Sequence, residues 1–196
     1  MTNAAEPIPL SANARSVLLI VDMQKFFFRL PERRVNLEQV VANINRLSDC
    51  FDAAGMPVYH VITAYQADGS DWDLKMKAWG LGELITGSED AELLPEVHRA
   101  PGHFTLVKTR YSAFFKTDLA ERLHDQEIQR VIVTGAYTHY CVNSTVFDAY
   151  AHDFVPGIIT DAVTSHMVAE AEMMITRMRR NGYHVLTTEE YLRTSI

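Results

Sequence analysis

Short apolar runs that are rich in β-branched residues recur along this chain, and helical patterns fill most of the gaps between them. The runs of strand length occupy residues 16–21, 58–62, 104–107, 131–134, 157–160 and 184–186. Strands that alternate with helices are typical of parallel sheets, because each crossover between parallel strands needs a long connection. The pattern therefore predicts an α/β fold with three layers, in which helices cover both faces of a mainly parallel sheet of about six strands.

Helical spacing marks the connections between these runs. One apolar face at this spacing is formed by Leu37, Val40, Val41, Ile44 and Leu47. Gly55 and Pro57 follow it and are expected to end this helix and open the next strand. Further helices are predicted after Thr117, which can cap one, over residues 138–153, and over about 169–181, where an Asn-Gly pair is a stop signal.

Residues 64–94 contain no clear strand pattern and are punctuated by four glycines. Long connections in compact domains are usually lids or binding loops, so we expect this excursion to lie near a ligand. No linker-like stretch or internal repeat divides the chain. We therefore predict one domain over residues 1–196, with residues 1–14 as an N-terminal extension.

Charge and composition exclude several classes of protein. The net charge is −7, and residues 177–180 form the only dense basic patch, which argues against a nucleic-acid surface. No stretch approaches the roughly 18 apolar residues of a membrane span, and the first residues do not resemble a secretion signal. We expect a soluble cytoplasmic protein, in which Cys50 and Cys141 are reduced thiols.

Three reactive side chains follow three of the predicted strands. Asp22 comes directly after SVLLIV, Lys108 after FTLV, and Cys141 a few residues after VIVTG. The carboxyl ends of parallel strands line the ligand crevice of such folds, so these side chains can converge although they lie far apart in the sequence. A carboxylate, an ammonium and a thiol together suggest nucleophilic hydrolysis, and a purely structural Asp22–Lys108 ion pair is the alternative.

The reactivity of the two cysteines is expected to differ. Cys141 would lie in the first turn of a helix, where the helix dipole and Lys108 favour the thiolate, whereas Asp22 opposes it. We expect the pKa of the Cys141 thiol to fall below its usual value of about 8.5. Cys50 lies within a helical pattern and is expected to be protected by burial.

Three ordered segments resemble those of the isochorismatase-like hydrolase superfamily, also called the cysteine hydrolases. They are LLIVDMQKFF, VKTRYSAFFKTDL and TGAYTHYCVNSTVFDAYAHDFVPGIITDA, and the similarity extends from about Ser16 to Tyr191. The resemblance implies a catalytic Asp22, Lys108 and Cys141. It also implies a cis peptide bond between Ala136 and Tyr137, an oxyanion hole formed by the N–H groups of Tyr137 and Cys141, and a homodimer or homotetramer.

Two branches of this superfamily fit different parts of the chain. True isochorismatases cleave an enol ether and release pyruvate, and RYSAFFKTDL and GAYTHY resemble them most. However, they typically carry Gly at the position of Cys141, and their glutamine after the second strand is matched only by a shifted Gln66. Nicotinamidases, in the amidase branch, carry an Asp-x-His metal motif that residues 60–75 lack. No metal or cofactor is therefore implied, and His60 is expected to be a packed core residue.

The resemblance places four aromatic residues around the substrate: Phe27, Trp79, Tyr111 and Tyr137. Such a wall suits a small planar or cyclic molecule. We expect a metal-independent cysteine hydrolase that cleaves an amide, ureido or related C–N bond of a small molecule. An isochorismatase-type enol-ether hydrolase and a catalytically silent scaffold or binding protein are the alternatives, and the role of His139, next to Tyr140, is left open.

Overall fold

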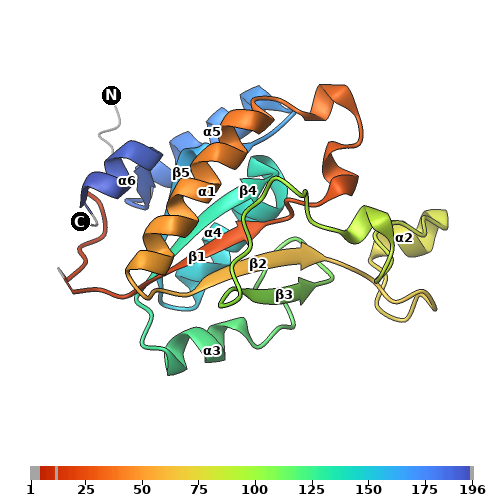
Figure 1. Ribbon diagram of the computed structural model, residues 1–196, viewed down its shortest axis with the longest axis horizontal. Coiled ribbons are helices and arrows are strands. Elements are labelled where there is room, and N and C mark those ends of the chain that lie inside the picture. Colours follow the sequence, from red (N-terminus) through yellow and green to blue (C-terminus); the bar gives the residue numbers. More distant parts are fainter. Residues whose placement is uncertain (1–4, 12, 195–196) are drawn as a thin grey trace.

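The computed structural model describes residues 5–11 and 13–194. Six parallel strands form one sheet in the order β3-β2-β1-β4-β5-β6 (Figure 1). Their bounds are β1 (Ser16–Val21), β2 (Val58–Thr63), β3 (Phe104–Lys108), β4 (Arg130–Ala136), β5 (Val155–Thr164) and β6 (His184–Leu186). The predicted α/β class is confirmed, and each predicted run is a strand, because buried β-branched runs pack well in a parallel sheet.

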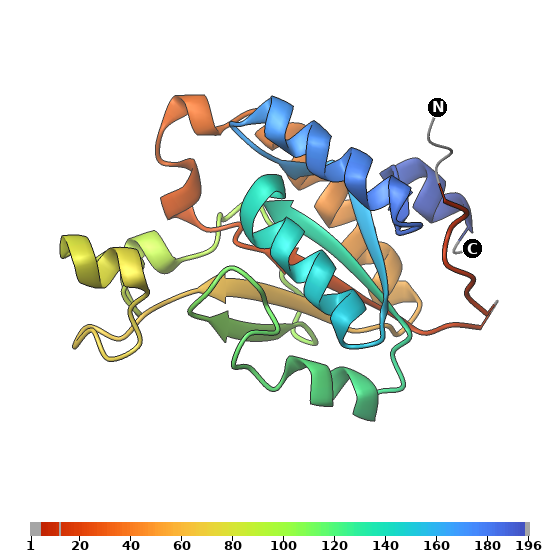
Figure 2. The same ribbon diagram turned by 180° about the vertical axis from the view of Figure 1, so that it is seen from behind.

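Helices cover both faces of the sheet and complete three layers (Figures 1 and 2). Helices α1 (Leu37–Ala53) and α6 (Thr188–Thr194) pack on one face, in a cluster that includes Leu47, Phe51 and Tyr191. Helices α3 (Leu119–Asp125), α4 (Asn143–Ala151) and α5 (Val168–Arg180) pack on the other face. The inner strands β1, β2 and β4 are buried on both sides, so the sheet supplies a rigid frame for the loops at its carboxyl edge.

Two of the predicted helices differ from the observed ones in detail. Residues 138–153 do not form one α-helix, because a π-helical turn, η4 (Thr138–Val142), precedes α4. In this turn the Val142 N–H donates to the Tyr137 carbonyl at 3.3 Å. Thr117 is not the N-cap of α3, which is Asp118, although the Thr117 hydroxyl accepts from the Leu119 N–H at 3.4 Å. Isolated π turns often occur at functional sites, and η4 carries Cys141.

The excursion over residues 64–94 extends beyond the carboxyl ends of β2 and β3 (Figure 1). It contains α2 (Leu74–Trp79) and the 3-10 turn η3 (Glu89–Ala91), and isolated bridges connect Tyr65 with Ile85 and Gln24 with Leu93. Two further 3-10 turns, η1 (Lys25–Phe28) and η2 (Pro31–Arg33), follow β1. The excursion and these turns stand at the same edge of the sheet.

The strand order reverses direction between β1 and β4, and this is where a ligand crevice is expected in such sheets. Gly135 makes the close approach of the two strands possible. A Cβ atom at this position would lie 2.1 Å from the Val21 carbonyl oxygen, and the φ angle of 101° is one that side chains other than glycine rarely adopt. The end of β4 is thus held against the end of β1.

The N-terminal extension contacts the far edge of the sheet. The Ile8 N–H donates to the Gly182 carbonyl at 2.8 Å, and His184 Nε2 lies 2.8 Å from the Ile8 carbonyl oxygen. Residues 1–4 and 12 of this predicted extension lie outside the described residues. Among the helices that the structure describes, none is long and apolar enough to cross a membrane.

Candidate active site

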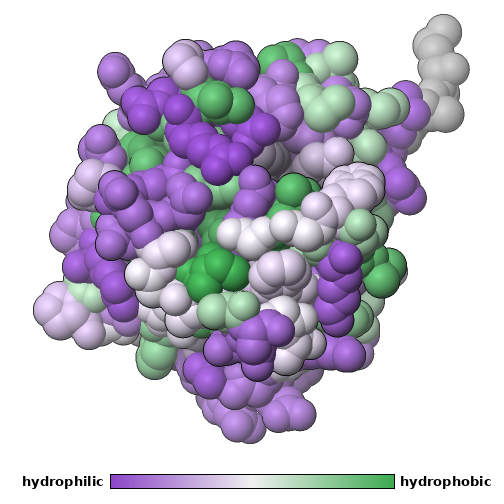
Figure 3. Space-filling view, turned by 90° about the vertical axis from the view of Figure 1, so that its right-hand side faces the viewer, coloured by the Kyte–Doolittle hydropathy of each residue, from purple (hydrophilic) through white to green (hydrophobic). Residues whose placement is uncertain are grey.

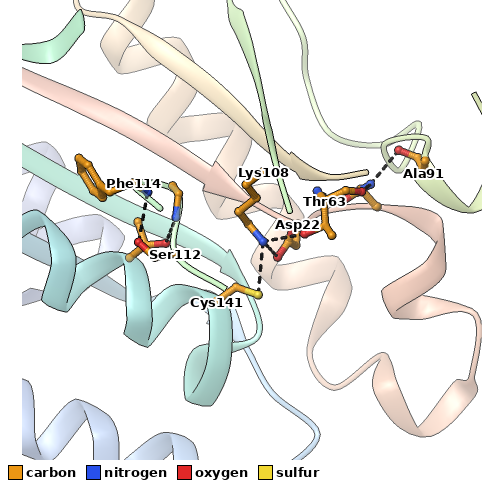
Figure 4. A network of polar contacts seen from close by, with 10 residues as sticks. Asp22, Thr63, Ala91, Lys108, Ser112, Phe114 and Cys141 are labelled. Carbon is orange, nitrogen blue, oxygen red and sulfur yellow. Dashed lines mark hydrogen bonds and ion pairs between the residues drawn. The ribbon is translucent and has the colours of Figure 1, made fainter. Parts of the chain in front are cut away.

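Asp22, Lys108 and Cys141 converge at the carboxyl edge of the sheet (Figure 4). Asp22 follows the last residue of β1 and has a φ angle of 52°, Lys108 is the last residue of β3, and Cys141 lies in η4 after β4. All three are buried, with exposed fractions of 0%, 1% and 7%. The parallel sheet brings them together because every strand ends at the same edge.

Lys108 is in contact with both other groups. Its Nζ atom lies 2.8 Å from Asp22 Oδ2 and 3.5 Å from Cys141 Sγ. The pair of Asp22 and Lys108 is a buried ion pair, and breaking such a pair leaves an uncompensated charge in the interior. The geometry thus contains the structural ion pair and, in addition, a thiol beside its ammonium group.

Thr63, the last residue of β2, completes this cluster and was missed by sequence reasoning. Its hydroxyl donates to Asp22 Oδ1 at 2.8 Å and accepts from Lys108 Nζ at 2.6 Å (Figure 4). Both carboxylate oxygens of Asp22 therefore have a donor. Only the position of Thr63 at a predicted strand end could have drawn attention to it, since threonine is common in strands.

Gln24 fixes the backbone around Thr63. Its side-chain oxygen accepts from the Thr63 N–H at 2.8 Å, and its Nε2 atom donates to the Thr63 carbonyl at 2.9 Å and to the Ala91 carbonyl at 2.8 Å. The Ala91 contact connects the end of the excursion to the floor of the site. One buried amide thus joins β1, β2 and the excursion.

Burial and local charge set the proton positions in the cluster. Burial alone would lower the pKa of Lys108, but the neighbouring Asp22 and Cys141 outweigh it and raise this pKa above its ordinary value, so Lys108 is an ammonium at neutral pH. Burial raises the pKa of the Cys141 thiol, the Asp22 charge raises it further, and Lys108 opposes both only in part. The expected lowering of the Cys141 pKa is wrong, because desolvation exceeds the effect of the ammonium.

The expectation for Cys50 also needs correction. This residue lies on α1, but its side chain is partly exposed, whereas Cys141 is buried. The helical pattern places Cys50 near the margin of the buried face, where solvent still reaches it. Burial therefore protects Cys141 more than Cys50.

A cavity of about 320 Å³ lies above Lys108 and Cys141. The four aromatic residues predicted for the substrate wall, Phe27, Trp79, Tyr111 and Tyr137, all line it, although Trp79 is 66% exposed and stands at its rim. Lining residues that sequence reasoning missed include Arg33, Tyr65, Arg110, Tyr140 and His166. On this side of the molecule, apolar and weakly polar side chains form a patch framed by hydrophilic ones (Figure 3).

The turn between β4 and η4 shapes one wall of the cavity. The Ala136–Tyr137 peptide bond is cis, and the Tyr137 hydroxyl donates to the Phe27 carbonyl. His139 is not among the described residues that line the cavity. Its ring packs against Tyr137 and Tyr140, and its Nδ1 atom lies 2.7 Å from Ser165 Oγ. His139 therefore supports this wall from behind.

A metal site would need several histidine, cysteine or acidic side chains close together. Among residues 5–11 and 13–194, no group of three or more His, Cys, Asp or Glu side chains could hold a metal ion. His60 is fully buried on β2, and its Nε2 atom lies 3.0 Å from His103 Nδ1. Its burial fits the predicted core position.

Comparison with known proteins identifies the family. The model of the isochorismatase domain matches residues 16–190. The chain is 32% identical to the phenazine biosynthesis protein PhzD of Pseudomonas fluorescens, over 90% of this chain and 84% of that protein. It is 31% identical to enterobactin synthase component B of Escherichia coli (strain K12), over 91% of this chain and 62% of that protein. A solved isochorismatase family protein from Desulfovibrio vulgaris aligns with a TM-score of 0.84 and 30% identity, over 92% of this chain and 98% of that chain. The chain belongs to the isochorismatase family of hydrolases.

Proposed function

We propose that this hydrolase is a metal-independent cysteine hydrolase that cleaves an amide, ureido or related C–N bond of a small molecule. One observation carries the proposal. The Lys108 ammonium lies within contact distance of both Asp22 and Cys141, at 2.8 Å and 3.5 Å, at the base of the cavity. A carboxylate base, a cation and a thiol in contact are the parts that nucleophilic acyl transfer needs.

In the first half of the proposed reaction, Cys141 Sγ attacks the substrate carbonyl carbon while the thiol proton passes to Asp22. The electron pair of the C=O bond moves to oxygen, and the N–H groups of Tyr137 and Cys141 stabilise this oxyanion. The raised pKa of Cys141 fits a thiol that stays protonated until the attack. Lys108 remains an ammonium and compensates the negative charge throughout.

The oxyanion then collapses, the C–N bond breaks, and Asp22 returns its proton to the departing nitrogen. A thioester with Cys141 remains. A water molecule gives a proton to Asp22 and attacks the thioester, and the C–S bond breaks as the sulfur recovers that proton. The products are a carboxylic or carbamic acid and an amine or ammonia, and the enzyme is restored.

Enol-ether hydrolysis is a second candidate, because one relative of the chain is described as a probable isochorismatase. This protein, from Pseudomonas chlororaphis, is 32% identical over 90% of this chain. In that reaction Asp22 would protonate the substrate, pyruvate would be released, and Cys141 would not take part. Gln66, which could have matched the glutamine of isochorismatases, is exposed and is not among the described residues that line the cavity.

A hydrolysis screen separates the two candidates. We expect wild-type protein to release ammonia or amine from small amides and ureides, and Cys141→Ala to lose at least about a thousandfold in kcat/KM. Cys50→Ala is the matched control and should keep its activity. An adduct on Cys141, trapped by acid quench and found by mass spectrometry, would support the thioester. Pyruvate release from isochorismate that persists in Cys141→Ala would overturn the proposal in favour of enol-ether hydrolysis.

We also propose that the protein assembles into a dimer or tetramer. Several large apolar side chains are exposed, with fractions of 85% for Leu74, 66% for Trp79 and 59% for Met173. Exposed apolar side chains of this kind are often covered by a partner when they cluster. The molar mass measured by light scattering at micromolar concentration checks this, and a monomer would contradict it.

A further inference from the structure

The cavity is more positively charged than the protein that surrounds it. The whole chain has a net charge of −7. In contrast, the charged residues that line the cavity are four cations and two acids, namely Arg33, Lys75, Lys108, Arg110, Asp73 and Glu83. An excess of one sign of charge in a cavity raises the local concentration of ligands of the opposite sign.

Neither of these two acids forms an ion pair with one of the four cations. Glu83 pairs with Arg29 at 3.1 Å, and the Asp73 carboxylate accepts the Met76 N–H at 2.8 Å as the N-cap of α2. Asp22, beneath the cavity, is paired with Lys108. Three cations therefore remain as candidates for binding an anionic group of a ligand.

Their surroundings distinguish Arg33 from the other two. The Arg110 guanidinium already donates to the carbonyls of Thr109 and Asp71, at 2.6 Å and 3.0 Å. Lys75 is exposed, so water screens its charge. Arg33 is partly buried, and no acid of residues 5–11 and 13–194 lies within ion-pair distance of its guanidinium.

Arg33 shares the cavity with the proposed reacting groups Lys108 and Cys141. It ends η2, which follows β1, and it lies beside the Tyr137 side chain at the turn after β4. Burial raises the pKa of Tyr137 to about 12, and Arg33 acts against this shift, as expected for a cation next to the hydroxyl. Arg33 therefore lines the same cavity as Tyr137 and Cys141.

We propose that Arg33 binds a carboxylate of the substrate, so that this enzyme prefers small amides or ureides that carry a negative charge. A planar guanidinium can hold a carboxylate through two parallel hydrogen bonds, which would fix the distance from the carboxylate to the bond that is cleaved. The preference among substrates rests on the proposed function, whereas the binding of an anion by Arg33 does not depend on it. The cavity, at about 320 Å³, admits only a small ligand of this kind.

Matched pairs of probes test the charge preference. The pairs are succinamate with butanamide, and N-carbamoylglycine with N-propylurea, which differ mainly in the carboxylate. In at least one pair we expect kcat/KM for the charged member to exceed that for the neutral one by tenfold or more. Arg33→Gln should reduce this ratio to about twofold, whereas Arg33→Lys should keep part of it. Lys77→Gln, which removes an exposed cation outside the cavity lining, is the control and should keep the wild-type ratio.

Binding measured by calorimetry on the inactive Cys141→Ala variant separates this inference from the proposed reaction. Tighter binding of the charged member that depends on Arg33 supports the anion site even if no probe is hydrolysed, and in that case only the proposed function fails. The inference is overturned if no pair favours the charged member in either assay. It is equally overturned if the preference persists in Arg33→Gln while that variant remains folded by circular dichroism.

Discussion

The Thr63 hydroxyl serves both charged partners of the buried ion pair. It donates to Asp22 at 2.8 Å and accepts from Lys108 at 2.6 Å, and it is only 6% exposed. In the proposed reaction Asp22 accepts and returns a proton, so its position and charge depend on the hydrogen bonds that it receives. Thr63 does not touch the attacked carbon in this scheme. It acts as a positioning residue for Asp22 and Lys108.

Thr63→Val keeps the side-chain shape and removes the hydroxyl. We expect kcat to fall about tenfold, which corresponds to the loss of roughly 1.4 kcal/mol from one hydrogen bond to a charged group. Thr63→Ser, which returns the hydroxyl, should restore kcat. An unchanged kcat in a folded Thr63→Val variant would show that Thr63 has only a packing role.

The two cysteines should respond differently to iodoacetamide at pH 8. Cys141 is buried, and burial and the Asp22 charge keep its thiol protonated, so we expect the partly exposed Cys50 to react first. Asp22→Asn removes one cause of the raised pKa and leaves Lys108 beside the sulfur. This variant should therefore label Cys141 faster than wild type and yet hydrolyse substrate far more slowly.

Mass spectrometry of partly labelled protein gives both rates, and Asp148→Asn, which changes an acid on α4 outside the cavity lining, is the control. If Asp22→Asn leaves the labelling of Cys141 unchanged, the charge of Asp22 does not hold the thiol proton. If it leaves hydrolysis unchanged, Asp22 is not the base.

At the scale of elements, β2 carries a titratable group in the core, in the middle of the strand. His60 is fully buried, and its Nε2 atom contacts His103, whose Nε2 atom lies 3.1 Å from Asp52 on α1. Burial, with further contributions from the nearby His103, Arg99 and His98, lowers the pKa of His60 to about 4. In the folded protein His60 is therefore neutral above about pH 4, whereas in the unfolded chain it gains a proton near its ordinary value of about 6.5.

The sign of the pH effect follows from this difference. Between about pH 6.5 and pH 4 the unfolded state binds more protons at His60, so the free energy of unfolding falls as the pH falls through this window. We expect a loss of about 2 kcal/mol from this group between pH 7 and pH 4.5. Urea denaturation across this range measures it. His60→Gln should flatten the dependence relative to wild type, and an unchanged slope would assign the acid sensitivity to other groups.

For the whole molecule, the proposed reaction needs no metal ion, because the buried Lys108 ammonium supplies the positive charge. Lys108 is held at this place by the ends of three neighbouring strands, which supply Asp22, Thr63 and Lys108 itself. We expect hydrolysis to be unchanged, within about twofold, after dialysis against EDTA. Elemental analysis of the active protein should find far less than one zinc or iron per chain. A loss of activity that added zinc restores would contradict this expectation.

The positions of the strands and the convergence of Asp22, Lys108 and Cys141 at one edge could be predicted from the sequence. The reason is that a buried parallel strand needs an uninterrupted β-branched run, and all strands of such a sheet end on the ligand side. The aromatic wall also followed from the sequence, through the resemblance to a family, and Phe27, Trp79, Tyr111 and Tyr137 all line the cavity.

Only the tertiary structure revealed what these groups contact. Thr63 reaches Asp22 across 41 positions and Lys108 across 45, and no local pattern records contacts between strands that are distant in sequence. The sequence likewise did not show that Arg33 lines the cavity, or how deeply each of the two thiols is buried. A helical pattern indicates which residues face the core but not how deeply each is buried. Cys141 is buried, and this burial keeps its thiol protonated, whereas Cys50 is partly exposed. The sequence thus determined the fold and the reactive groups, whereas the packing decided their proton states, because desolvation depends on every neighbour in space.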